Sequence, residues 1–171
     1  KWPDDVESAP EETLTDHIQR VLNECGPNGR PRAPGFSAFE AVGRGAKVTS
    51  SDGRIQVAPD LVFRPPHPRT VRNRGDWGWF VECKIIAGAT WVRKYVEQGV
   101  SRFASGTYAY RMPSGAMLAY VRDQSTPHAC LAPHLPRGLR AGTSADTAES
   151  HHERGALPRP CVDVTITHIW L

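Results

Sequence analysis

The feature that most constrains the fold is an apolar run at residues 77–87 with an acid and a lysine in its middle. A run that is apolar almost throughout is typical of a strand buried on both faces. Because side chains alternate along a strand, Glu82 and Lys84 point to one face and Cys83 to the other. Two buried charges are costly unless they are paired or bound to a metal. Taken alone, so common a triplet favours a buried ion pair.

A second acid changes that interpretation. Residues 54–64 predict another strand, in which Asp60 is again surrounded by apolar residues. Pro59 cannot donate to a ladder and therefore belongs at an edge or a bulge. The stretch from Asp60 to Glu82 is long enough for two antiparallel strands and a joining loop, which would place the two carboxylates side by side. Converging carboxylates form a hard-oxygen site of the kind that suits Mg²⁺ or Mn²⁺.

Helical periodicity precedes and follows these strands. Residues 10–24 predict an amphipathic helix with one buried face, formed by Leu14, Ile18, Val21 and Leu22. Glu11 lies at the end of that face and projects toward the core, whereas Glu12 turns away. Residues 90–109 predict a second helix. Its buried side is formed by Val92, Val96, Val100 and Phe103, and its opposite side by Lys94, Gln98 and Arg102.

The remaining elements are expected to complete a sheet. Strands are predicted at residues 36–49 and 116–122, and a closing strand with one solvated face at residues 162–170. Residues 124–160 are rich in Pro, Gly, Ser and His and show little periodicity. They predict an insertion, a lid or a mobile segment, with a short helix near residues 144–153.

The chain as a whole predicts a single globular domain spanning residues 1–171. No apolar stretch is long enough for a membrane span. The first residues lack an initiator Met and the plan of a signal peptide, so we expect a chain that was trimmed or belongs to a longer protein. Four widely spaced cysteines indicate reduced thiols rather than a disulfide framework, and hence a cytoplasmic location.

The distribution of charge is more informative than its total. A net charge of +3 is too small to indicate a nucleic-acid partner by itself. Residues 64–74 contain several basic side chains and no acid. Such a run can neutralise phosphates, although a solvated loop explains it equally well. We call this segment the basic run; its arginines are Arg64, Arg69, Arg72 and Arg74.

The two acidic strands carry a recognisable motif. Pro59 and Asp60, followed one hairpin later by Glu82, Cys83 and Lys84, match the defined positions of the PD-(D/E)xK motif. In this respect the chain resembles the PD-(D/E)xK nuclease superfamily, whose members share the restriction-endonuclease-like fold.

The resemblance extends over roughly residues 11–122 and includes the order of the elements. It implies an α/β fold with a restriction-endonuclease-like α-β-β-β-α-β core, in which helices flank a mixed central sheet. A C-terminal insertion and closing strand would be added to that core. Glu11 matches an acid that these enzymes often carry on the helix before the sheet. Gln98 resembles a polar residue on the helix after the lysine strand.

The resemblance also implies roles for these residues. Asp60, Glu82 and the backbone carbonyl of Cys83 would hold one Mg²⁺ or Mn²⁺ against the scissile phosphate. Glu11 would complete the shell of that ion or bind a second one. Lys84 would orient the attacking water and help to deprotonate it. The four arginines of the basic run and Lys94 are expected to contact phosphates, while Gln98 and Arg102 would contact the phosphate or position the water.

We therefore expect a Mg²⁺-dependent deoxyribonuclease, with a role in restriction, in defence against foreign DNA or as a toxin module. DNA is a more natural partner than RNA here, and a homo-oligomer or further domains of a longer chain stay open. One alternative is a catalytically silent member of the same fold that binds nucleic acid or a partner protein. Another is a metal-dependent hydrolase with a different substrate. The intact acid–lysine set disfavours the first alternative, and the basic run disfavours the second.

Two weaker hypotheses concern other residue types. A zinc site would have to use histidines and cysteines whose spacing matches no recognised knuckle, and surface histidines explain them better. Its candidates are His128, Cys130, His134, His151, His152 and Cys161. Aromatic side chains could stack on nucleic-acid bases, although aromatics in strands and helices are more commonly core residues. These are Trp77, Trp79 and Trp91.

Overall fold

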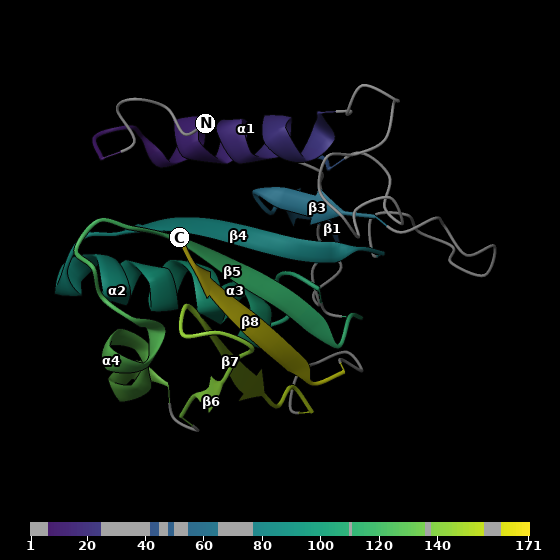
Figure 1. Cartoon of the computed structure of the whole chain (residues 1–171). Helices are drawn as coiled ribbons and strands as arrows, with labels where there is room; N and C mark the ends of the chain where they lie inside the picture. Colours follow the sequence, from purple (N-terminus) through teal and green to yellow (C-terminus); the bar gives the residue numbers. More distant parts are fainter. Residues whose placement is uncertain are drawn as a thin grey trace.

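The computed structural model is an α/β structure in which helices cover both faces of a mixed six-stranded sheet (Figure 1). One face carries α1, and the opposite face carries the remaining helices (Figure 1). No helix in the described part of the chain is long and apolar enough to cross a membrane. The structure describes residues 7–24, 42–44, 48–49, 55–64, 77–109, 111–135, 138–155 and 162–171.

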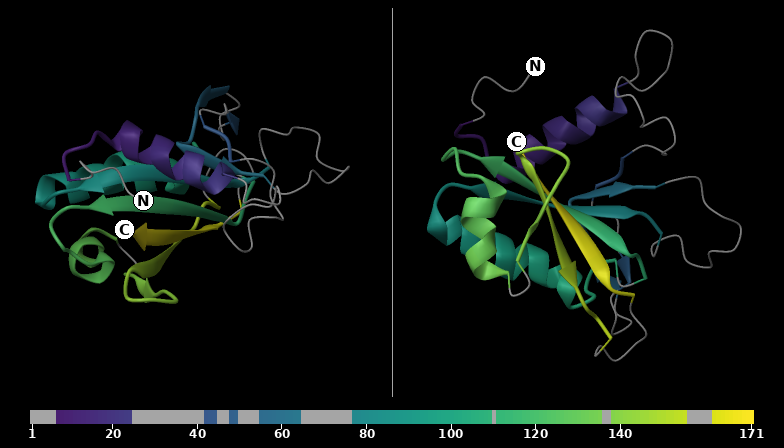
Figure 2. Two further views of the ribbon diagram at one scale, coloured as in Figure 1. Left: turned by 45° about the horizontal axis from the view of Figure 1, so that its top comes forward. Right: turned by 60° about the horizontal axis from the view of Figure 1, so that its bottom comes forward.

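The sheet has the strand order β3-β4-β5-β8-β7-β6. Its three central strands, β4, β5 and β8, are parallel, whereas β3 pairs antiparallel with β4 and β7 antiparallel with β8. The strands fan out with the usual twist of an open sheet (Figure 2). Their bounds are β3 Leu61–Phe63, β4 Trp79–Ile86, β5 Ser114–Val121, β6 Arg140–Ala141, β7 Thr147–His152 and β8 Val164–Trp170.

Alternation along β4 divides the core into two clusters. Val81, Cys83 and Ile85 pack toward α1, and Phe80 and Ile86 pack toward the helices of the opposite face. The strand is therefore buried on both sides, as its apolar sequence predicts. The helices are α1 Glu11–Asn23, α2 Ala89–Tyr95, the π-helix η3 Val96–Val100, α3 Ser101–Ala104, α4 Pro127–Leu131 and the short 3₁₀-helix η4 Ala132–His134.

The strand expected at residues 54–64 is divided in two. A separate two-stranded sheet pairs β1 (Val48–Thr49) with β2 (Ile55–Val57), and β3 joins the main sheet after a break. The break contains Pro59, which has no N–H for a ladder. Of the strand expected at residues 36–49, residues 36–41 and 45–47 lie outside the described part of the chain, and residues 48–49 form β1.

The helix expected at residues 90–109 is present but not uniform. It starts as α2, widens into the π-helix η3 and ends as α3 at Ala104. Three of the four predicted core residues, Val92, Val100 and Phe103, are buried. Within η3, a Cβ atom added to Gly99 would come within 2.2 Å of the Met117 side chain and 3.8 Å of Glu82. The widened turn therefore brings backbone close to the sheet where Glu82 lies.

Residues 124–160 contribute to the sheet itself. The helix expected near residues 144–153 is wrong, because β7 occupies this region and pairs along its length with β8. Ala148 and Ser150 are buried, in the period-two pattern of a strand, and the helix in this segment is α4 instead. Pairing with a long neighbouring strand outweighs the weak local preference of a short polar segment. The strand expected to close the sheet, β8, lies between β5 and β7; its buried residues alternate as predicted, but its other face is partly covered and not fully solvated.

Candidate active site

The candidate site forms along an edge of β4 that β3 leaves uncovered. The pairing of the two strands ends with Leu61 opposite Val81, and no described strand covers this edge farther along β4. If the register continued by two residues, Pro59 would lie opposite Cys83, and proline has no N–H to donate to the Cys83 carbonyl. The backbone groups of this edge must therefore find side-chain partners.

Two acidic side chains bind the N–H groups of this edge. The Oδ2 atom of Asp60 accepts from the backbone N–H of Cys83 at 2.8 Å. The Oε2 atom of Glu11 accepts from the backbone N–H of Ile85 at 3.3 Å. Asp60 comes from the break before β3, and Glu11 from the first turn of α1. Both carboxylates are thus held in fixed directions by β4.

Packing of α1 on the sheet fixes Glu11 in this place. Leu14 is almost fully buried beneath the helix, and the hydroxyl of Thr15 lies 3.0 Å from the hydroxyl of Tyr120 on β5. Glu11 faces the cluster, whereas Glu12 is exposed.

The ammonium of Lys84 lies at the centre of the cluster. Its Nζ atom is 3.0 Å from Oε1 of Glu82, 3.1 Å from Oε1 of Glu11 and 3.9 Å from Oδ2 of Asp60. It also donates to the backbone carbonyl of Cys83 at 2.6 Å. The four groups that the sequence proposes as metal ligands therefore surround one cation of the protein itself. We call these five residues the acid–lysine cluster.

The protonation of Lys84 follows from these neighbours. Burial alone would lower its pKa, but the carboxylates of Glu82 and Glu11 outweigh burial, and the pKa is raised. Lys84 is thus a cation at neutral pH, and it neutralises part of the negative charge that the three acids bring together.

Glu82 is the most buried acid of the cluster, with 1% of its surface exposed. Its Oε1 atom accepts from Lys84 and also from Nη1 of Arg102, at 2.6 Å. Its Oε2 atom is buried and has no hydrogen-bond partner in the described structure. Burial, and next the nearby charge of Asp60, raise the pKa of Glu82 against the opposing effect of the two cations. An unpartnered carboxylate oxygen in this position fits the needs of a bound cation.

Arg102 occupies a different place from the one that the sequence predicts. The sequence groups it with Lys94 and Gln98 on the solvent side of the helix, but its guanidinium reaches the sheet and pairs with Glu82. It also donates to the hydroxyl of Tyr108 at 2.9 Å. Tyr108 is a site residue that sequence reasoning misses, because an aromatic residue after a helix is typical of the core and no motif contains it.

The other predicted contacts lie apart from the cluster. Lys94 and Gln98 are exposed on α2 and η3, and the Lys94 ammonium lies 4.7 Å from the ring centroid of Trp91. Arg64 follows β3 directly, while the remaining members of the basic run lie outside the described residues: Arg69, Arg72 and Arg74. The structure thus brings Glu11, Asp60, Glu82, Cys83, Lys84 and Arg102 together and leaves Lys94 and Gln98 at the surface.

Within the described ranges, no three His, Cys, Asp or Glu side chains lie together in an arrangement that could hold a metal ion by themselves. In the acid–lysine cluster, the ammonium stands between the carboxylates. Of the zinc candidates, His152 lies 2.8 Å from the Ser150 hydroxyl and His151 lies 4.0 Å from Asp163, and Cys161 falls outside the described residues.

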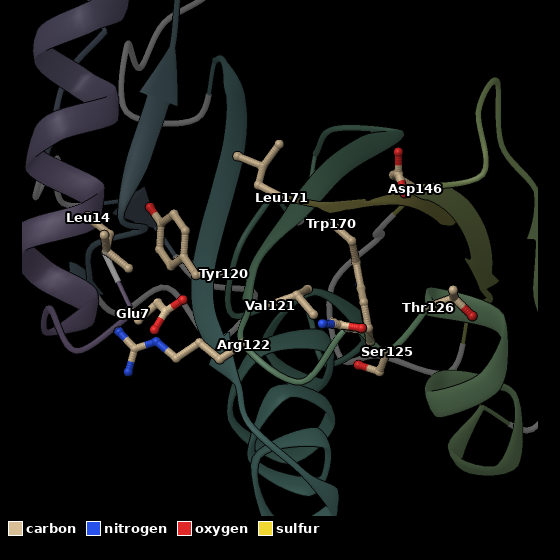
Figure 3. Close-up of a pocket in the computed structure, with 11 residues that line it drawn as sticks. Glu7, Leu14, Tyr120, Val121, Arg122, Ser125, Thr126, Asp146, Trp170 and Leu171 are labelled. Atoms are coloured by element: carbon tan, nitrogen blue, oxygen red, sulfur yellow. The ribbon is translucent and has the colours of Figure 1, made fainter. Parts of the chain in front are cut away.

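A separate cavity of about 650 Å³ opens at the carboxyl ends of β5 and β8 (Figure 3). Its lining includes Tyr120 and Trp170 with the charged side chains of Arg122 and Asp146. None of the predicted site residues lines it. The acid–lysine cluster therefore does not line this cavity.

No protein-family model matches the chain, and no curated protein or solved structure is significantly similar to it. The geometry of the acid–lysine cluster is therefore the basis on which a function can be inferred.

Proposed function

We propose that the protein is a metal-dependent nuclease of the PD-(D/E)xK type that hydrolyses phosphodiester bonds of DNA. The observation that carries the proposal is the cluster on the free edge of β4. There, oxygen atoms of Glu11, Asp60, Glu82 and Cys83 converge on one cationic group, and one buried oxygen of Glu82 stays unpartnered. Carboxylate and carbonyl oxygens are the ligands that Mg²⁺ and Mn²⁺ prefer in proteins.

The arrangement of the elements supports a restriction-endonuclease-like topology. The order α1, β1, β2, β3, β4, a helical segment and β5 has one strand more than the expected α-β-β-β-α-β plan, because the strand expected at residues 54–64 is divided into β2 and β3. Asp60 and Glu82 come from adjacent antiparallel segments, as the motif requires. The residues of the motif therefore meet at one strand edge although the motif is divided along the chain.

The proposed mechanism assigns a task to each group of this edge. Asp60, Glu82 and the Cys83 carbonyl would hold the divalent cation, with Glu11 beside them. The bound cation supplies acidified water and stabilises the negative charge of the phosphorane-like transition state. The backbone N–H groups that bind Asp60 and Glu11 keep these carboxylates oriented before substrate arrives.

Lys84 would orient the attacking water in that mechanism. The water oxygen forms a bond to phosphorus, and the bond to the leaving oxygen breaks. The proton of the water passes to solvent, because Lys84 is already an ammonium and cannot accept it, and the leaving oxygen takes a proton from solvent. The ammonium contacts Glu11 and Glu82 beside the reacting centre, and a bound cation would share the oxygens that hold it.

The substrate and setting follow from the basic run and from the resemblance to the nuclease superfamily. The basic run begins with Arg64 directly after β3, and its arginines are proposed to contact DNA phosphates. Restriction, defence against foreign DNA or a toxin module in the cytoplasm are settings in which such domains recur.

A second proposal has its own observation. Glu82 is held by both Lys84 and Arg102, so the cluster already balances much of its charge without a metal. A catalytically silent protein that uses this network as a structural ion cluster would look similar. The two proposals differ in whether divalent cations bind and whether DNA is cut.

Cleavage assays test the proposal directly. Plasmid, linear duplex DNA, single-stranded DNA and RNA are incubated with the protein in Mg²⁺, Mn²⁺ or EDTA. We expect cleavage of DNA with either cation, none with EDTA, and none by Asp60→Asn. Glu12→Gln, at an exposed acid of α1, serves as a control for the preparation. Metal-independent cleavage, or equal cleavage by Asp60→Asn, would contradict the proposal.

The two acids at the start of α1 give a matched pair of variants. Glu11 binds Lys84 and the N–H of Ile85, whereas Glu12 is exposed. We expect Glu11→Gln to slow cleavage by about 10–100-fold, as is typical when a group that orients metal ligands is lost. Glu12→Gln should cut at the parental rate. Initial rates of plasmid cleavage at saturating Mg²⁺ measure both, and equal losses would exclude Glu11 from the site.

A further inference from the structure

Tyr108 lies in the loop that follows α3, with its side chain fully buried. Its ring makes an edge contact with Phe103, with 5.5 Å between the centroids. The guanidinium carbon of Arg102 lies 5.6 Å from the centre of the same ring. Two residues of α3 therefore hold the ring, and this fixes the position of the hydroxyl group.

The hydroxyl of Tyr108 joins two segments that are far apart in the chain. It donates to the backbone carbonyl of Ala58 at 3.1 Å and accepts from Nη1 of Arg102 at 2.9 Å. A phenol has one hydrogen to donate and a guanidinium can only donate, so the two bonds are compatible. Burial, and next the charge of Glu82, raise the pKa of Tyr108 well above its usual value. The donor hydrogen is therefore retained at neutral pH.

Each of these partners supports one of the two central carboxylates. Ala58 lies two residues before Asp60, in the break between β2 and β3 where pairing with β4 has not begun. Arg102 uses the same Nη1 atom to donate to Glu82 at 2.6 Å. The hydroxyl thus lies between the backbone that carries Asp60 and the cation that holds Glu82.

We infer that Tyr108 is a positioning residue that sets the separation of Asp60 and Glu82 for one divalent cation. The inference rests on the proposed metal site and requires no contact between Tyr108 and the cation or the substrate. Without the hydroxyl, the segment at Ala58 loses this anchor and Arg102 loses a partner that directs it toward Glu82. The two carboxylates then sample more positions, and ordering them at binding lowers the affinity for the cation.

Tyr108→Phe tests the inference because it removes the hydroxyl and keeps the ring. Binding of MnCl₂ is measured by isothermal titration calorimetry without nucleic acid, and the thermal midpoint is measured in EDTA. We expect the dissociation constant for Mn²⁺ to rise by about 10–100-fold. The midpoint should fall by about 2–4 °C, the loss expected for one buried hydrogen bond in a chain of this size.

Tyr95→Phe is a matched control. Tyr95 is also fully buried, and its hydroxyl lies 2.9 Å from Nδ1 of His168. It belongs to the core between α2 and β8, and its hydrogen bond to His168 does not involve the acid–lysine cluster. We expect a similar fall in the thermal midpoint and no change in Mn²⁺ affinity. If both variants lost the same Mn²⁺ affinity, the loss would come from weaker packing of the core and not from the position of Tyr108. That result would overturn the inference.

A double-variant cycle tests the route through Arg102. If Tyr108 acts partly by directing Arg102, the loss of Mn²⁺ affinity in Tyr108→Phe/Arg102→Gln should be smaller than the combined losses of the single variants. Fully independent losses would overturn that route. A parent protein that binds no Mn²⁺ would refute the metal site and this inference together. A parent that binds Mn²⁺, with Tyr108→Phe binding equally well, would refute only the inference.

Discussion

Replacement of Lys84 by methionine is expected to slow DNA cleavage by about 10²–10⁴-fold while the protein stays folded. The ammonium lies 3.0 Å from Glu82 and 3.1 Å from Glu11, at the point where the proposed reaction takes place. Its loss removes the group that we propose orients the attacking water. Methionine keeps an apolar stem of similar length, so the packing around β4 should be preserved.

Stability in the presence of metal distinguishes catalysis from a structural ion pair. Without the ammonium, the carboxylates of Glu11, Asp60 and Glu82 repel one another, although Arg102 still donates to Glu82. The thermal midpoint of Lys84→Met in EDTA should therefore be below that of the parent. A divalent cation that binds the folded state raises the midpoint. We expect MnCl₂ to raise it more in the variant than in the parent, because the ammonium no longer competes for the same oxygens.

Cleavage rates and thermal midpoints in EDTA and in MnCl₂ together decide the question. Arg93→Met, at an exposed arginine of α2, is the control for the loss of one positive charge and should change stability by less than about 0.5 kcal/mol. The structural hypothesis has a different signature. It predicts a loss of roughly 3–5 kcal/mol that Mn²⁺ does not restore, together with undiminished cleavage. That combination would show that the cluster is an ion pair and not an active site.

The elements that follow from the sequence are those with strong hydrophobic periodicity. The helix α1 and the strands β4 and β8 are present where their patterns predict them. The failures occur where partners decide the structure. Residues 147–152 are polar and favour no state strongly, and they form a strand because the whole length of β7 pairs with β8. The break at Pro59 is visible in the sequence. Its consequence is that the edge of β4 beside Cys83 is left unpaired, and this depends on the register of β3, which the sequence does not give.

The site shows the same division. Strand alternation and helical spacing suffice to propose that Glu11, Asp60, Glu82 and Lys84 meet, and the structure brings these side chains together. The position of Arg102 does not follow from spacing. Its long side chain extends from the flank of the helix to reach Glu82 and Tyr108, while Val100 and Phe103 stay buried as the helical spacing predicts.

Arg154 is another residue for which the sequence gives no signal. It lies in a polar segment after β7, yet only 1% of its surface is exposed. Its guanidinium donates to the carbonyls of Met112 and Ala109 at 2.9 and 3.0 Å, and to that of Val162 at 2.6 Å. Longer bonds reach the carbonyls of Phe103 and Tyr108. One buried side chain thus organises the backbone between α3 and β5.

Replacement of Arg154 by methionine is expected to be the most destabilising of these changes. It leaves several buried carbonyls without their charged donor, at a cost of roughly 3–5 kcal/mol. Ala109 adds to the effect, because its φ of 50° lies in a region that an alanine occupies only when its surroundings hold it there. At about 2–4 °C per kcal/mol, the thermal midpoint should fall by roughly 6–20 °C.

Arg140→Met is the matched control, since Arg140 is exposed on β6 and its loss should change stability by less than about 0.5 kcal/mol. Urea unfolding of both variants beside the parent gives the free energies. A loss below about 1 kcal/mol for Arg154→Met would mean that water satisfies the carbonyls and that the guanidinium is dispensable. The loop also carries Tyr108, so loosening it should weaken Mn²⁺ binding at temperatures where Arg154→Met is still folded. Destabilisation with unchanged Mn²⁺ affinity would separate the loop from the site.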